Sequence, residues 1–310
     1  MGDVTFIHGI ANKPPVEELH RIWVDALASD GGVDLDARGV SSRMVYWADL
    51  LYAEPLPTVV EGDGLESATD EPTGVEEATV AWLAGASDAE WQFVGRLAAA
   101  YGVEELAPES APPPTAEAVE GFERIPLPGP VKRWLMARLL RDVHHYLYDV
   151  EFSPREGPCM AIRREIRQRV VAAVEEGSER PGPHLVVAHS MGTVIAYDCL
   201  KRVADIPAVD GLITIGGPLG MDEVQDAFAP EWTRQDGFPA ERVRGRWVNV
   251  FDRLDPVPGL APTIGGDYRR SGAKVVDDLH QPGWGRWRHG IDRYLAGQRL
   301  RDAFVAILAG

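Results

Sequence analysis

A serine near the middle of the chain lies between a β-rich run and a helical run, in the pentapeptide Ala188-His189-Ser190-Met191-Gly192. A serine hydroxyl is a weak nucleophile unless a sharp turn aims it at a base and places backbone N–H groups near the developing oxyanion. Small residues two positions before and after the serine let such a turn pack against the neighbouring strand and helix. Ala188 and Gly192 occupy these positions, so the pattern predicts Ser190 as a nucleophile. Pentapeptides of this kind occur by chance in many proteins. The predicted strand before the serine and the predicted helix after it are therefore the main evidence that Ser190 is a nucleophile.

This part of the chain resembles the α/β-hydrolase superfamily of serine hydrolases, in which nucleophile, acid and histidine follow one another in that order. Ala188 stands where the usual motif has glycine, as in many members of the superfamily. The resemblance, which is to the lipase- and esterase-like members with an inserted lid, covers roughly residues 3–50 and 157–308. It implies an α/β-hydrolase fold with a mainly parallel sheet of about six strands, helices on both faces and an inserted helical lid.

The resemblance implies that the acid of the triad follows a predicted strand, which in this chain ends near Phe251. Asp255-Pro256-Val257-Pro258 resembles the acid turn of lipase-like hydrolases, which points to Asp255. A carboxylate there would hold the imidazole of the base in the right tautomer and stabilise the imidazolium that forms. Asp252 is closer to the end of the strand and remains the alternative, although a turn or helix-cap role also suits it.

The base is expected after the last strand, at the start of the final helix. His289, in Arg288-His289-Gly290-Ile291, resembles the histidine of the superfamily, and His280 remains the alternative because it is nearer the strand. We expect His189 to fix the turn at Ser190 or to line the pocket. His144 and His145 are expected on an exposed stretch of a helix in the insertion.

Two backbone N–H groups are candidates for the oxyanion site. The N–H of Met191 qualifies by its position directly after Ser190. The run Phe6-Ile7-His8-Gly9-Ile10 resembles the His-Gly oxyanion loop of the superfamily, which nominates the N–H of Ile10. In this interpretation His8 organises the loop and does not act as a base.

The implied function is hydrolysis of a carboxylic ester through a Ser-His-Asp triad and an acyl-enzyme intermediate. We expect a small-molecule substrate with a short-to-medium acyl group, no cofactor and no metal. A thioesterase or an acyltransferase would use the same triad, and a non-catalytic binding protein of the same fold is a third possibility.

Strand-like and helical runs alternate along most of the chain, which predicts a mainly parallel sheet with helices on both faces. The predicted strands are 4–7, 44–47, 184–188, 211–215, 246–251 and 273–276. The predicted helices of this part are 15–29, 159–176, 191–203 and 290–308.

The alternation is interrupted by an acidic segment, and we predict a core of 1–52 and 156–310 with residues 53–155 as an inserted lid. Residues 53–123 contain 16 acidic residues and one basic residue, a net charge of −15, whereas the rest of the chain carries −2. Helical periods over 88–101 and 131–150 predict two helices that are either a mobile lid or fixed cover. Flexible links are predicted over 61–74 and 108–114.

The overall composition excludes several classes of protein. The net charge of −17 disfavours binding to nucleic acids or to anionic lipid surfaces. No run is long and apolar enough for a membrane span, and the first residues lack the pattern of a secretion signal. Two cysteines, Cys159 and Cys199, cannot form a disulfide framework. These features predict a cytoplasmic protein, and its oligomeric state is left open.

Overall fold

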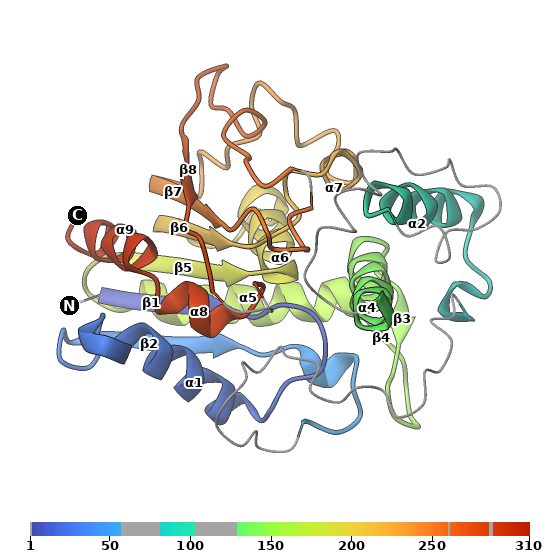
Figure 1. Ribbon diagram of the computed structural model, residues 1–310, viewed down its shortest axis with the longest axis horizontal. Helices are drawn as coiled ribbons and strands as arrows, with labels where there is room; N and C mark the ends of the chain where they lie inside the picture. Colours follow the sequence, from blue (N-terminus) through green and yellow to red (C-terminus); the bar gives the residue numbers. More distant parts are fainter. Residues whose placement is uncertain (1, 57–80, 103–128, 260, 285–287) are drawn as a thin grey trace.

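The centre of the protein is a six-stranded sheet in the order β2-β1-β5-β6-β7-β8, in which all neighbouring strands are parallel. The structure is a computed structural model that describes residues 2–56, 81–102, 129–259, 261–284 and 288–310 (Figure 1). The strands of the sheet are β1 (Gly2–Ile7), β2 (Val40–Val45), β5 (His184–His189), β6 (Val209–Ile215), β7 (Val243–Phe251) and β8 (Val276–His280). β3 (Glu151–Phe152) and β4 (Met160–Ala161) form a separate antiparallel pair. The predicted α/β architecture with a parallel six-stranded sheet is confirmed.

Helices cover both faces of the sheet. One face packs against α1 (Val16–Ala28), α8 (Ile291–Leu295) and α9 (Gln298–Leu308), and the other against α5 (Ile162–Ser178) and α6 (Met191–Arg202). Along β5, Leu185 and Val187 face the first layer, whereas Val186 and Ala188 face the second. Since both faces are covered, β5 is buried along its whole length and its sequence is continuously apolar between its terminal histidines.

Two further helices, α2 (Asp88–Ala100) and α4 (Gly129–Leu147), lie beyond the carboxyl ends of the strands (Figure 1). α2 begins at a capping box in which Ser87 and Glu90 satisfy each other's backbone N–H groups. Leu97 of α2 and Leu139 of α4 belong to the same buried cluster as the apolar residues of α5 and α6. The predicted links over 61–74 and 108–114 lie outside the described residues. The short elements are α7 (Asp222–Asp226) and the 3-10 helices at Ser29–Gly31, Ala48–Leu50 and Ala81–Leu83.

The predicted closing helix over 290–308 is interrupted, which was not expected. α8 ends at Leu295 and α9 begins at Gln298, with Gly297 between them. The amide of Gln281 fills the break, because it donates to Tyr294 O at 2.9 Å and accepts from the Leu300 N–H at 2.8 Å. A Cβ atom at Gly297 would lie 2.0 Å from the Gln281 Nε2, so a larger residue there would displace the Gln281 amide from the break.

Two strand positions also differ from the expectations. β2 covers 40–45 instead of 44–47, and β8 covers 276–280 instead of 273–276. β8 contains Asp277 and Asp278, and these two charged residues interrupt the apolar pattern that predicts a buried strand. Both are edge strands, where exposed polar side chains weaken the apolar signal.

The prediction that His144 and His145 are exposed is wrong. Each is 2% exposed, and Trp82 packs against both rings at centroid distances of 5.1 and 5.8 Å. Glu90 of α2 accepts a hydrogen bond from the His144 Nε2 at 3.0 Å, so α2 covers this stretch of α4. Burial lowers the pKa of both histidines, in the case of His145 to about 4.

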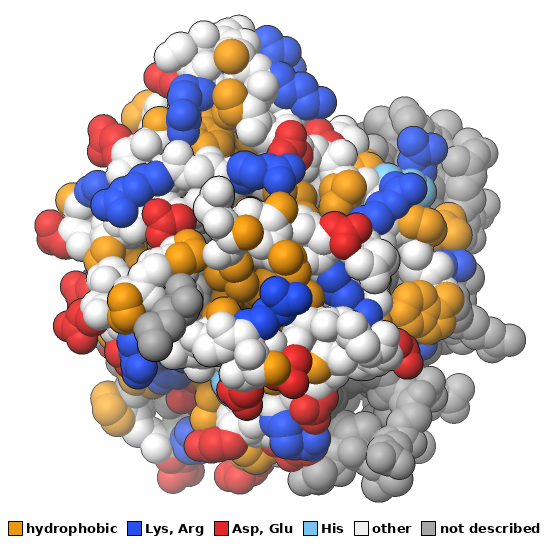
Figure 2. Space-filling model, turned by 90° about the vertical axis from the view of Figure 1, so that its left-hand side faces the viewer, with side chains coloured by type: hydrophobic (Ala, Val, Ile, Leu, Met, Phe, Trp, Pro, Cys, Tyr) orange, Lys and Arg blue, Asp and Glu red, His pale blue; other side chains and the backbone are white. Residues whose placement is uncertain are grey.

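Acidic and basic side chains are interspersed over the side of the molecule on which β1 begins (Figure 2). The mixture agrees with the nearly balanced charge of the chain outside its acidic segment. Within the described part of the chain, no helix combines the length and the apolar character needed to cross a membrane.

Candidate active site

Ser190 lies in the sharp turn between β5 and α6, with a backbone φ of 55° and ψ of −128°. Residues with a side chain adopt a positive φ rarely, and such conformations cluster at functional sites. The turn is possible because Gly192 packs directly under β1, where a Cβ atom would lie 2.4 Å from Ile7 O. The Ser190 Oγ is buried and has no hydrogen-bond partner among the described residues. A buried hydroxyl of this kind is a candidate for a reacting group.

Asp255 and His289 are in direct contact, although 34 residues separate them in the sequence. The His289 Nδ1 lies 2.9 Å from each carboxylate oxygen of Asp255. Since a carboxylate only accepts, Nδ1 is the donor, and the second ring nitrogen, Nε2, lies on the side of the ring away from Asp255. Asp255 follows β7, and His289 precedes α8.

Two further groups hold the Asp255 carboxylate. The Val257 N–H donates to Oδ1 at 2.9 Å, and the Tyr294 hydroxyl donates to Oδ2 at 2.7 Å. Burial, and then the charge of Asp255, raise the pKa of Tyr294 well above its usual value. The hydroxyl therefore stays protonated and remains a donor. Tyr294 was not identified from the sequence as a site residue, although it lies five positions after His289 on the final helical pattern.

The ring of His289 lies next to the ring of His189, in a tilted arrangement, and next to a glycine loop. The ring of His189, the residue before Ser190, lies 4.5 Å from the ring of His289 between centroids. Gly216, after β6, has a φ of 52°, and a Cβ atom there would lie 2.6 Å from the Asp255 Oδ2. Gly217 packs against Thr193, whose hydroxyl donates to Ser190 O at 2.8 Å. His189 and the Gly216–Gly217 loop thus contact both the Asp255–His289 pair and the turn at Ser190.

The two alternative residues make other contacts. The Asp252 carboxylate accepts from the Leu254 N–H at 2.9 Å and from the Gly283 N–H at 2.6 Å, and Arg288 lies 3.6 Å from it. These contacts join the turn after β7 to the loop after β8. His280 ends β8, and its ring packs against Phe251 at 5.4 Å between centroids. The structure places Asp255 and His289 in contact with each other, whereas Asp252 contacts backbone N–H groups and Arg288, and His280 packs against Phe251.

The segments that carry the two candidate oxyanion donors both approach Ser190. Met191 is the first residue of α6, and the first N–H groups of a helix have no acceptor within it. The loop that contains Ile10 approaches from β1, since a Cβ atom at Gly9 would lie 2.5 Å from the Ser190 Cβ and 3.0 Å from its Oγ. Ser190 is therefore bordered by the start of α6 and by the backbone at Gly9.

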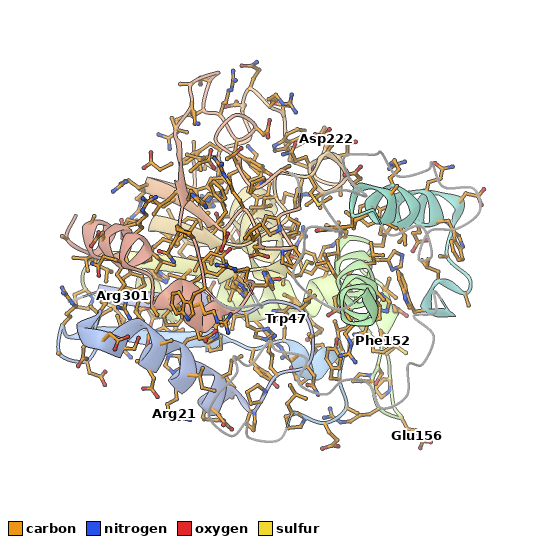
Figure 3. The ribbon with its side chains drawn as sticks, viewed as in Figure 1. Arg21, Trp47, Phe152, Glu156, Asp222 and Arg301 are labelled. Carbon is orange, nitrogen blue, oxygen red and sulfur yellow. The ribbon has the colours of Figure 1, made fainter. Side chains whose placement is uncertain are left out.

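His8 orients the loop after β1. Its Nε2 accepts the Trp47 N–H at 3.0 Å, so Nδ1 carries the proton and donates to Gly9 O at 2.8 Å. The rings of His8 and Trp47 stack at 4.8 Å, and Figure 3 labels Trp47 near the centre of the molecule. These contacts agree with the expectation that His8 organises the loop.

The site is closed to solvent in this structure. Ser190, His289 and Asp255 are 0%, 1% and 3% exposed. Part of the cover comes from Tyr101, the residue after α2, whose hydroxyl donates to Val257 O at 2.7 Å. Sequence reasoning did not identify this contact, because 156 residues separate the two partners.

No model of a known protein family matches this chain, and no curated protein matches its sequence. Within the ranges that the structure describes, no three His, Cys, Asp or Glu side chains are grouped so that they could hold a metal ion.

Proposed function

We propose that the protein is a serine hydrolase of the α/β-hydrolase fold, with Ser190, His289 and Asp255 as its triad. The observation that carries this proposal is the Asp255–His289 hydrogen bond, formed beside a serine with a strained backbone and a buried hydroxyl that makes no hydrogen bond to the described part of the chain. Nucleophile, acid and base follow β5, β7 and β8 in that order. The helices α2 and α4 would then belong to an inserted lid.

The geometry supports acyl transfer to Ser190. His289 would take the proton of the Ser190 hydroxyl as the oxygen attacks an acyl carbonyl, and would then give it to the leaving alcohol. Asp255 would keep the proton of His289 on Nδ1 and stabilise the imidazolium. The N–H groups of Met191 and Ile10 would bind the oxyanion of the tetrahedral intermediate. Water, activated by His289, would release the acid and restore Ser190.

We infer a carboxylic ester with a short-to-medium acyl group as the substrate class. His289 and its carboxylate partner would supply the proton transfers that ester cleavage needs, so the proposed reaction requires no cofactor. A panel of p-nitrophenyl esters of increasing chain length, together with an acyl thioester, tests the class. Cleavage of the thioester without cleavage of any ester would redirect the proposal to a thioesterase.

The decisive experiment is reaction with a fluorophosphonate, followed by mass-spectrometric mapping of the modified peptide. We expect labelling at Ser190 in the wild type and none in Ser190→Ala. Ser178→Ala is the matched control, because Ser178 is exposed at the end of α5 and should not affect labelling. Folded wild-type protein that is neither labelled nor active on the ester panel would contradict the proposal and favour a binding protein.

A further inference from the structure

The peptide bond between Ile10 and Ala11 is held at both of its polar atoms by buried side chains of opposite formal charge. The Lys13 Nζ donates to Ile10 O at 2.6 Å, and the Ala11 N–H donates to the Asp142 Oδ2 at 3.1 Å. Lys13 and Asp142 are each 1% exposed. Hydrogen bonds to ionised groups are roughly twice as strong as neutral ones. One peptide plane of the loop after β1 is therefore fixed from two sides.

Asp142 approaches this loop from α4 and is itself held in place. Its Oδ1 accepts from the Nε and Nη2 of Arg141 at 2.9 and 2.7 Å, and its Oδ2 accepts from the Tyr52 hydroxyl at 3.3 Å. Arg141 also donates to the Tyr52 hydroxyl at 2.6 Å, and its guanidinium lies 5.0 Å from the centroid of the Tyr52 ring. These contacts balance the charge of the buried carboxylate and fix the direction in which it faces.

The preceding peptide bond, between Gly9 and Ile10, is held through its carbonyl by His8 at 2.8 Å. The C=O and N–H of a trans peptide point in opposite directions, so the Ile10 N–H faces away from His8. Ala11 has a φ of 66°, a left-handed conformation that a residue with a side chain keeps only when its surroundings impose it. Lys13 and Asp142 are the surroundings that impose it.

We propose that Lys13 and Asp142 are positioning residues that clamp the Ile10–Ala11 peptide and thereby orient the Ile10 N–H toward the oxyanion. This inference rests on the proposed function. Neither residue touches the substrate, and both act through the loop backbone. Because Asp142 belongs to α4, a helix of the inserted segment completes the catalytic geometry of the core.

The test compares Lys13→Met and Asp142→Asn with the wild type in ester hydrolysis. Methionine keeps the length of Lys13 without its donor, and asparagine keeps the shape of Asp142 without its charge. We expect kcat to fall at least about tenfold, with KM within about twofold, because loss of a whole oxyanion donor costs about 10²–10³ in kcat. The affinity for a trifluoromethyl ketone, which forms a tetrahedral adduct, should fall by the same factor as kcat/KM.

Tyr146→Phe is the matched control. Tyr146 lies one turn after Asp142 on the same helix, and its hydroxyl donates to the buried Asp198 at 2.7 Å, away from the loop after β1. This variant should lower the melting temperature and leave kcat unchanged. A wild type that is labelled at Ser190, with both clamp variants at wild-type kcat, would overturn the clamp alone. A wild type with neither labelling nor turnover would overturn the proposed function together with the clamp.

Discussion

The Tyr294 hydroxyl joins the two acidic residues of the turn after β7, since it donates to the Asp255 carboxylate at 2.7 Å and accepts from the Asp252 N–H at 2.9 Å. A residue of α8 thus sets the distance between the backbone at Asp252 and the side chain at Asp255. The same helix begins two residues after His289. Asp255 and His289 are therefore oriented by one short element.

Replacement of Tyr294 by phenylalanine should destabilise the protein, because it removes both hydrogen bonds and leaves the buried Asp252 N–H without its acceptor. The free energy of unfolding should fall by about 1–3 kcal/mol. Urea denaturation measures this change. Tyr148→Phe is the control, since Tyr148 is 37% exposed and its hydroxyl lies at the long distance of 3.5 Å from Ala89 O. Equal losses in the two variants would contradict the role of Tyr294.

Asparagine at position 255 should abolish most of the ester hydrolysis, because an amide can stabilise the wrong tautomer of His289. In the serine-protease template the corresponding change lowers kcat by about 10⁴-fold. Asp252→Asn should affect kcat far less, since Asp252 contacts backbone N–H groups and Arg288. Steady-state kinetics of both variants decide between the two acids. A larger loss in Asp252→Asn would reverse the assignment.

A methyl group at Gly9 should push the loop after β1 away from the nucleophile. The new Cβ atom would lie 2.5 Å from the Ser190 Cβ, a separation that requires the backbone to move. Displacement of about 1 Å at a reacting site costs about 100-fold in rate, so kcat should fall by that order in Gly9→Ala. Gly266→Ala is the control, because no atom lies within 4 Å of a Cβ atom there. An active Gly9→Ala variant would show that the loop does not border the reacting atoms.

Acidification should destabilise the protein in part through His145. Burial, followed by the neighbouring His144, lowers the pKa of His145 to about 4 from its usual value of 6.5. Between about pH 4 and 6.5 the unfolded chain binds a proton at this residue that the folded chain does not, so stability falls as the pH decreases through this window.

The test compares His145→Gln with the wild type in urea denaturation at a series of pH values. Each proton taken up on unfolding contributes about 1.4 kcal/mol per pH unit, and the variant should lose one such contribution between about pH 4 and 6.5. Above pH 7, where the imidazole is neutral in both states, the difference between the two proteins should not depend on pH. Parallel curves throughout would show that His145 does not titrate on unfolding.

The arrangement of the strands could be predicted from the sequence because burial on both faces makes parallel strands largely apolar, as in Leu185–Ala188. Asp255 and His289 were nominated by the resemblance to the α/β-hydrolase superfamily, and strand order alone left Asp252 and His280 open, since all of these groups follow parallel strands and so lie at one edge of the sheet. The break at Gly297 was missed because its cause, the side chain of Gln281, comes from another part of the chain.

The surroundings of α4 could not be predicted from the sequence, because they too come from distant parts of the chain. The cover of His144 and His145 comes from Trp82 and Glu90, more than fifty residues earlier in the chain. The burial of Asp142 could have been predicted from its spacing. It falls three residues after Leu139 and four before Tyr146, and therefore on the apolar face of the helix. An acidic residue at such a position is buried with partners, and the Ala11 N–H and Arg141 are the partners found.

The shared core of α2, α4 and the sheet limits how this protein could be altered by recombination. Leu97 and Leu139 pack in one cluster with Ile7 and Val45 of the sheet, and α4 also contacts α5 and α6. A chimera that replaced only residues 53–155 would leave this apolar surface facing an unrelated segment. Exchange of substrate preference between such chains therefore requires that the contact surfaces on both sides be transferred together.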